Sequence, residues 1–318
     1  MLSRRDLLIL SGAAAVSAAP SSLTGKERVD RALAGEDVDR PPFTFWYHFL
    51  DEKLPGERHA ASTLKFHRKF RTDLVKVMSD YPFPRPSGEW FEVKVDENPY
   101  PRQIRALELI RAGLRGRNYF VETVFNPWNV AEKLSSPALV GQMMREKPQV
   151  LLDALEAIAR SEAGHVRKAL KAGAAGVFLA IANAQDGILT REEYQKFSAP
   201  FDRMIVEAAG GAPLNILHLH GNKVYLDLFW KGWPVAAINY SNFGTGVSVA
   251  QARANYDGLL LTGIDEVNFR KLGEEELKRQ IQTAREAAGK RFLLTPGCSV
   301  PNETTDAEMM RLVRAVGA

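Results

Sequence analysis

Cysteine is almost absent from this sequence, which has 318 residues and a single cysteine, Cys298. One thiol cannot close a disulfide within the chain, so no disulfide framework holds the fold together. Cys298 is then expected to be buried as a small apolar residue, bound to a metal ion, or reactive.

A strong excess of either charge is also missing. The 42 Lys and Arg residues and 38 Asp and Glu residues give a net charge of +4, and no basic stretch is interleaved with aromatic residues. We therefore expect no nucleic-acid partner. With 45% hydrophobic residues, the chain resembles an average globular protein and is long enough to bury a full core.

No hydrophobic run reaches the ~20 residues that a membrane-spanning helix needs. The apolar run at residues 7–10 follows Arg4 and Arg5 and precedes the small residues Ser17, Ala18 and Ala19. This three-part layout is typical of a twin-arginine (Tat) export signal. We predict a signal peptide over residues 1–19, export to the periplasm or another extracytoplasmic compartment, and no stable membrane insertion after cleavage.

Short apolar runs alternate with longer helical patterns over the remaining residues 20–318. Such alternation predicts right-handed βαβ units and a parallel sheet, and eight units predict a single (β/α)8 TIM barrel with an N-terminal helix. An open doubly wound sheet is the competing α/β fold, but no Gly-rich fingerprint follows the first run. The eight predicted strands cover residues 42–48, 74–80, 119–125, 176–182, 214–220, 235–241, 258–263 and 291–296.

Helix signals support this reading. Thr24 and Glu27 form a capping box that opens a helix ending near Gly35, and Thr190 and Glu193 form a second one before a helix ending at Gly210. Apolar residues at helical spacing predict a long helix over residues 149–172. Further helices are predicted at residues 60–71, 102–112, 136–146, 223–231, 247–256, 274–288 and 306–316.

Polar side chains gather where the predicted strands end, which is the catalytic end of a TIM barrel. His218 and His220 are two residues apart, so their side chains point to the same face of a strand. Cys298 follows the last strand, and the barrel could bring it across the mouth to the two imidazoles. Two His and one thiolate form a usable catalytic zinc site. The alternative is a hydrogen-bonded pair of core histidines.

Other strand-end residues are candidates for catalysis or substrate binding. Asp80 could act as a general base or cap the next loop, and Tyr47 and His48 could line the pocket or pack in the barrel. His59, His67 and His165 fall within predicted helices, where we expect them on solvated faces. The candidate substrate-binding residues are Asn126, Asn183, Asn239 and Asp265.

Several segments resemble the uroporphyrinogen decarboxylase superfamily, in the same order along residues 24–316. Residues 27–42 resemble its opening helix and first strand, and Asp80 resembles its strand-end Asp. Residues 260–265 are similar to a Gly-Asn-(Leu/Val)-Asp segment of the family. Residues 295–298, with Pro301 and residues 303–305, resemble its last strand and loop.

The resemblance implies one of two chemistries. Decarboxylases of the family have an Arg-rich loop after the first strand, whereas residues 45–52 contain no Arg here. An acidic tetrapyrrole needs cationic partners, so porphyrinogen decarboxylation is not expected. The cobalamin-linked methyltransferases bind zinc through a His-x-Cys pair and a Cys in the last strand. His218, His220 and Cys298 are similar to that set, with His in place of the first Cys.

The resemblance therefore implies a zinc-dependent enzyme that transfers a methyl group to or from a thiol or similar nucleophile, with a corrinoid or corrinoid protein as partner. One thiolate donates less charge to zinc than two, so the ion would be a stronger Lewis acid. Two alternatives stay open: uroporphyrinogen decarboxylase itself, and an exported, non-catalytic binder of a tetrapyrrole or other small molecule.

Overall fold

The computed structural model describes residues 23–49, 54–79 and 81–318. The predicted signal peptide, residues 1–19, and the candidate catalytic residue Asp80 lie outside these ranges. In the described part, no helix has the length and apolar character needed to cross a membrane.

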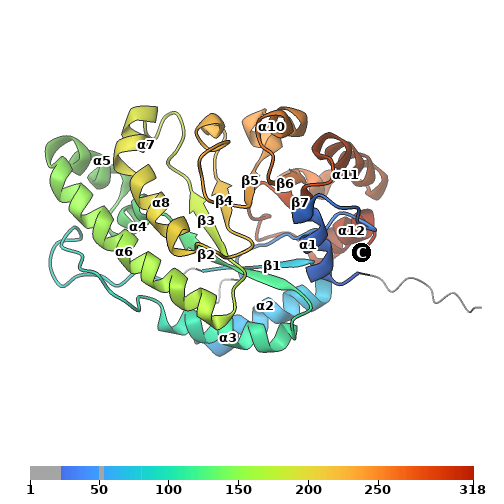
Figure 1. Cartoon of the computed structure of the whole chain (residues 1–318), viewed down its shortest axis with the longest axis horizontal. Coiled ribbons are helices and arrows are strands. Elements are labelled where there is room, and N and C mark those ends of the chain that lie inside the picture. The colour runs from blue at the N-terminus through green and yellow to red at the C-terminus, as the bar shows by residue number, and fades with distance from the viewer. Residues whose placement is uncertain (1–22, 50–53, 80) are drawn as a thin grey trace, which may run out of the picture.

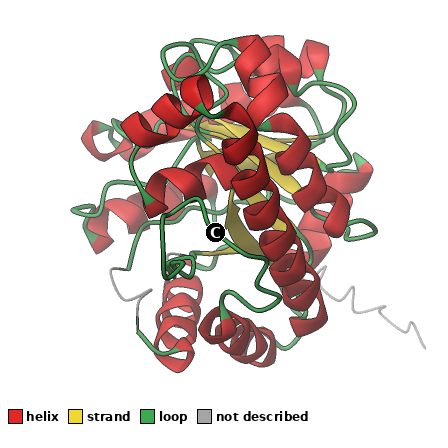
Figure 2. Ribbon diagram, turned by 90° about the vertical axis from the view of Figure 1, so that its left-hand side faces the viewer, coloured by secondary structure: helices red, strands yellow, loops and turns green. Residues whose placement is uncertain are grey.

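Seven parallel strands form one curled sheet with the order β1 to β7 along the chain. Helices surround this sheet (Figures 1 and 2). Each strand pairs with the next strand along the chain, after a helical crossover. This strand order is typical of a barrel-like α/β fold. The strands are β1 (Leu74–Val77), β2 (Tyr119–Phe125), β3 (Val177–Ile181), β4 (Ile216–Leu219), β5 (Ala237–Tyr240), β6 (Leu259–Ile264) and β7 (Phe292–Pro296).

The prediction of a first strand at residues 42–48 is wrong, because this segment does not form a regular strand. It forms one parallel bridge, between Phe43 and Leu294 of β7, and its other edge accepts a hydrogen bond from the Asp73 backbone at 2.8 Å. A ladder cannot extend here, since Pro42 has no amide hydrogen and the Phe43 amide donates to the Asp73 carboxylate at 3.0 Å. The segment therefore fills the gap between β7 and β1 without becoming an eighth strand.

The helical layer agrees with most predictions and corrects two. The helix expected at residues 223–231 is only a 3-10 turn, Leu226–Leu228, and the helix expected after Thr190 divides at Ser198, before Pro200. The helices are α1 (Gly25–Ala34), α2 (Gly56–Phe70), α3 (Pro101–Leu114), α4 (Pro127–Leu134), α5 (Pro137–Glu146), α6 (Pro148–Ala172), α7 (Arg191–Phe197), α8 (Ala199–Ala208), α9 (Asn242–Thr245), α10 (Val249–Asn255), α11 (Glu274–Ala288) and α12 (Asp306–Val316).

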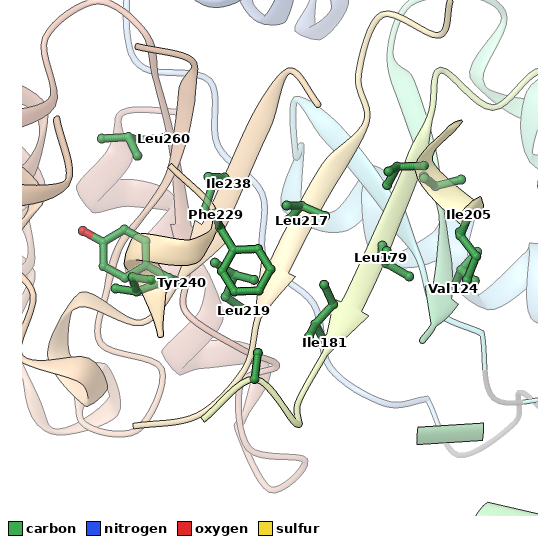
Figure 3. Packing of buried hydrophobic residues seen from close by; sticks show 14 of the residues in the cluster. Val124, Leu179, Ile181, Ile205, Leu217, Leu219, Phe229, Ile238, Tyr240 and Leu260 are labelled. Carbon is green, nitrogen blue, oxygen red and sulfur yellow. The ribbon is translucent and has the colours of Figure 1, made fainter. Parts of the chain in front are cut away.

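Side chains alternate between the two faces of the sheet. Leu217 and Leu219 of β4 lie on the outer face with Ile181 and Ile238, where the core cluster continues into the helices (Figure 3). Because successive strand residues point to opposite faces, the intervening His218 faces the interior of the barrel. The interior carries its own cluster of buried residues, which includes Trp46, Phe178, Ile216 and Leu261.

Candidate metal centre

His218 is held in one orientation by its surroundings. Its ring stacks on Phe178 with centroids 5.0 Å apart, and its Nδ1 lies 2.6 Å from Oδ1 of Asn239. The Asn239 amide nitrogen has three acceptors, the carbonyl oxygens of Leu261 and Pro296 and the Thr295 hydroxyl, so Oδ1 must be the atom that faces His218. A carbonyl oxygen only accepts, which places the proton on Nδ1 and leaves a lone pair on Nε2.

His220 and Cys298 approach this lone pair from two loops. Gly221 follows His220 with φ 126°, a left-handed conformation that favours glycine, and turns the chain away from the barrel. Gly297 precedes Cys298 and lies against Ser241 so closely that a Cβ would meet the Ser241 Cβ at 2.2 Å. One ligand atom each of His218, His220 and Cys298 lies within 4.8 Å of the other two.

The pKa shifts of Cys298 and His220 favour a thiolate. Burial would raise the pKa of Cys298, but its interactions with the two neighbouring imidazoles outweigh burial and lower it to about 4. The pKa of His220 is raised in turn, chiefly by its hydrogen bond with the Cys298 sulfur. Cys298 is then a thiolate at neutral pH, the form that binds a metal or acts as a nucleophile.

The three side chains fit a zinc ion by their chemistry. Tetrahedral zinc with bonds of about 2.0–2.3 Å separates its ligands by about 3–4 Å, so the observed spacing needs a closure of only about 1 Å. The bond from His218 to Asn239 is the outer-shell contact that orients a ligating imidazole. We call His218, His220 and Cys298 the metal centre, as the candidate site for such an ion. Within residues 23–49, 54–79 and 81–318, they are the one group of three His, Cys, Asp or Glu residues that converges in this way.

A cavity of about 550 Å³ opens onto the metal centre. Two ammonium groups lie in its wall, and sequence reasoning missed both. The Lys76 ammonium lies 5.4 Å from the Trp46 ring and 5.0 Å from the Phe178 ring, and that of Lys133 lies 3.1 Å from the Phe125 ring. A lysine within the apolar run of β1 was the available signal, since such a residue faces either solvent or a cavity.

The other candidate residues occupy different places. His48 lines the cavity, whereas Tyr47 packs on the rings of Phe49 and Phe66. Asp265 is half-buried, and its carboxylate caps the following turn by accepting from the amides of Val267 and Asn268.

The three candidate asparagines lie behind the wall of the cavity. Asn126, Asn183 and Asn239 are fully buried. Asn126 caps α4 and donates to Oδ1 of Asn183 at 2.7 Å, while Asn239 holds His218. The structure thus brings together His218, His220, Cys298 and His48, and places these amides in supporting positions.

Two histidines expected on solvated faces are buried instead. His59 and His165 are 0% and 1% exposed, which corrects the sequence interpretation, and His67 is half-buried. His165 on α6 bonds to Glu122 of β2 at 2.8 Å, and Gln103 donates to the same carboxylate at 2.8 Å. Tyr100 donates to Glu162 at 2.5 Å. We call Tyr100, Gln103, Glu122, Glu162 and His165 the buried network.

Sequence comparisons identify uroporphyrinogen decarboxylases as relatives. A family model described as uroporphyrinogen decarboxylase (URO-D) matches residues 77–318, about three quarters of the chain. A uroporphyrinogen decarboxylase from a Synechococcus strain is 26% identical and is matched over 95% of this chain and 96% of its own length. The enzyme of the same name from Salmonella typhimurium is 29% identical over 64% of this chain, which spans about half (52%) of that relative.

Solved structures share the fold at low sequence identity. A methyltransferase from Methanosarcina mazei superposes with a TM-score of 0.73 at 17% identity, covering 93% of this chain and 99% of the other. A B12-independent methionine synthase from a Shewanella strain superposes with a TM-score of 0.54 at 9% identity, covering 87% of this chain and 91% of the other.

Proposed function

Because the chain belongs to the uroporphyrinogen decarboxylase family, we propose that it is a zinc-dependent enzyme that transfers a methyl group to or from a thiol or a similar small nucleophile. A corrinoid or a corrinoid protein would be its methyl donor or acceptor. The single observation that carries this proposal is the convergence of a thiolate and two imidazoles at the mouth of a cavity.

His218, His220 and Cys298 would hold the ion. The Asn239 carbonyl keeps the His218 proton on Nδ1, so that Nε2 is ready to bind without rearrangement. The two neighbouring imidazoles lower the pKa of Cys298 to about 4, which favours the deprotonated form at neutral pH. Zinc bound there would act as a Lewis acid that lowers the pKa of a substrate thiol.

The cavity walls would position the nucleophile. The rings of Trp46 and Phe178 lie beside His218, and an apolar part of the substrate would pack against them. His48 lines the same cavity and would move a proton to or from the substrate. Asp80 and Tyr47 complete the proposed catalytic set, with Asp80 as general base.

Elemental analysis tests the metal directly. We expect about one zinc per chain in the wild type and less than a tenth of that in Cys298→Ser, since zinc affinity should fall by more than the 10–100-fold typical of losing an outer-shell partner. His67→Gln, which changes a histidine outside the cavity, should keep its zinc. A Cys298→Ser protein with full zinc content would refute the proposal.

Decarboxylation is the second candidate, because the family model and the Synechococcus relative bear that name. Against it, the described residues that line the cavity include two lysines and no arginine for the several carboxylates of a porphyrinogen. We expect turnover of uroporphyrinogen far below a typical enzyme rate of ~10 per second. A rate within about tenfold of that value would favour the decarboxylase.

A non-catalytic binder is the third possibility. A purified protein with a bound chromophore and no zinc would support a tetrapyrrole or corrinoid carrier. Bound zinc without a chromophore would favour the enzyme.

Export by the Tat route remains part of the proposal. A tagged protein with Arg4→Lys and Arg5→Lys should fail to reach the extracytoplasmic side, because the Tat route reads the arginine pair. Fractionation that finds the double variant exported at the wild-type rate would contradict this.

A further inference from the structure

Two neighbouring cavities lie at the end of the barrel opposite the metal centre. They have volumes of about 590 and 620 Å³, and Asn118 lines both. Their walls include Thr72, Asp73 and Asn118, which come directly before β1 and β2. The metal centre lies at the other ends of strands, in the last residues of β4 and just after β4 and β7. The start of α1 and the residues that follow α12 meet at the first cavity, as their neighbouring places in Figure 1 indicate.

Five exposed arginines line these cavities and make no side-chain hydrogen bond or ion pair within the described ranges. Three belong to the first cavity and two to the second. The acidic side chains that line these cavities already have other partners. Arg28 and Arg40 bind Asp39 and Asp73 at 2.5–3.2 Å, and Arg105 binds Glu108 at 3.4 Å. The five are Arg68, Arg71, Arg111, Arg115 and Arg117.

The backbone singles out two of these arginines. Arg71 and Arg115 have φ values of 53° and 51°, and they are the non-glycine residues of the described chain with positive φ. They end α2 and α3, at positions where glycine is usual because a side chain is unfavourable there. Cations are favoured at the C-terminal ends of helices, but that preference does not explain Arg117 or the gathering of all five around two adjoining cavities.

Repulsion among these arginines favours an anion between them. Guanidinium groups bind phosphate through paired hydrogen bonds, and Arg exceeds Lys in this respect. Ion pairs join four side chains that line the first cavity and hold them in place: Arg28, Asp39, Arg40 and Asp73. We propose that the two cavities form one binding site for a ligand with two or more phosphate groups, either a soluble oligophosphate or the headgroups of anionic phospholipids. This site is independent of the zinc proposal.

Calorimetric titration of the full-length protein with tripolyphosphate tests the site. The variant Arg71→Gly with Arg117→Gln removes two charges while glycine keeps the left-handed backbone of residue 71. We expect its dissociation constant to rise by about tenfold or more, as the loss of charge-assisted hydrogen bonds would produce. Arg145→Gln, which removes an exposed arginine of α5 outside both cavities, should bind like the wild type. Zinc content and the thermal midpoint should be unchanged in both variants.

Co-sedimentation with vesicles separates the two sources of phosphate. Binding to phosphatidylglycerol vesicles but not phosphatidylcholine vesicles, lost in the double variant, would identify lipid headgroups. Binding of tripolyphosphate alone, with the same loss, would identify a soluble ligand. No binding of either probe, equal binding by the double variant, or an equal loss in Arg145→Gln would overturn the proposal.

Discussion

His218 and His165 are both almost fully buried, at 5% and 1% exposure, and each bonds to a polar side chain on a neighbouring element. The metal centre around His218 borders a cavity, whereas no member of the buried network around His165 lines that cavity. The pKa shifts also differ. That of Cys298 is lowered to about 4 by two imidazoles, while burial raises that of Glu162 to about 7.

The comparison teaches that a buried histidine with a partner is not by itself a functional site. In the buried network, hydrogen bonds hold α3 and α6 against β2. In the metal centre, His218 donates to Asn239 through one ring nitrogen, and its other ring nitrogen faces the two further candidate ligands, His220 and Cys298. A buried histidine is therefore a candidate for chemistry when it borders a cavity and has a ring nitrogen free to bind, and it has a structural role when it lacks both.

Among substitutions that separate the two regions, we expect His165→Ala to have the largest effect, a loss of stability without a loss of zinc. The change leaves the Glu122 carboxylate buried without its histidine partner, and breaking a buried pair in this way costs about 3–5 kcal/mol. Denaturant unfolding would measure the loss, and elemental analysis should find the zinc content unchanged.

His220→Ala supplies the matched control. His220 is exposed, so its loss should cost less than about 1 kcal/mol of stability, but zinc should be lost. Equal effects of the two substitutions on both measurements would remove the distinction between the regions.

A pH titration of stability sharpens the comparison. The pKa of Glu162 is raised by burial from 4.5 to about 7 in the folded protein, so the native state holds a proton that the unfolded state releases. The contribution of Glu162 to the free energy of unfolding should be fully present below pH 4.5. It should then fall by about 3 kcal/mol as the pH rises toward 7, since each unit of pKa difference corresponds to 1.36 kcal/mol.

Glu162→Gln should remove this part of the slope, because the amide does not titrate and its oxygen can still accept from Tyr100. Asp202, whose pKa burial also raises to about 7, leaves a second contribution of the same sign. The measurement is the free energy of unfolding of both proteins from pH 4.5 to 8. Equal pH dependence in Glu162→Gln and the wild type would show that Glu162 is already ionised in the folded protein.

The smallest effect concerns Asn239. Asn239→Ala releases the His218 ring and should weaken zinc binding by about 10–100-fold, the usual cost of losing an outer-shell partner. Competition with a chromophoric chelator at pH 7 measures this. Asn126→Ala, which removes a buried asparagine away from the metal centre, should leave the affinity unchanged. An equal loss in both variants would show that the effect comes from general destabilisation.

The sequence predicted the alternation of elements well, because hydrophobic period and helix caps are local properties. Thr24 and Glu27 form the expected capping box, and the helix predicted at residues 149–172 is α6 with one more residue. One exception among the strands is the segment at residues 42–48. Its apolar residues suit a strand, but strand pairing also needs amide donors at the right positions, and Pro42 and Asp73 prevent this.

For the site, the sequence alone predicted that His218 and His220 point the same way, since side-chain direction in a strand depends on spacing, and that Cys298 follows the last strand. In the structure His220 lies just past the end of β4. Only the tertiary structure decided what surrounds them. In the structure, Lys76 lines the cavity and Asn239 binds His218, while His59 and His165 are buried. Five arginines lie together at the end of the barrel opposite the metal centre. These are contacts between residues far apart in the chain, and hydrogen-bond partners, cavities and pKa values depend on such contacts rather than on local pattern.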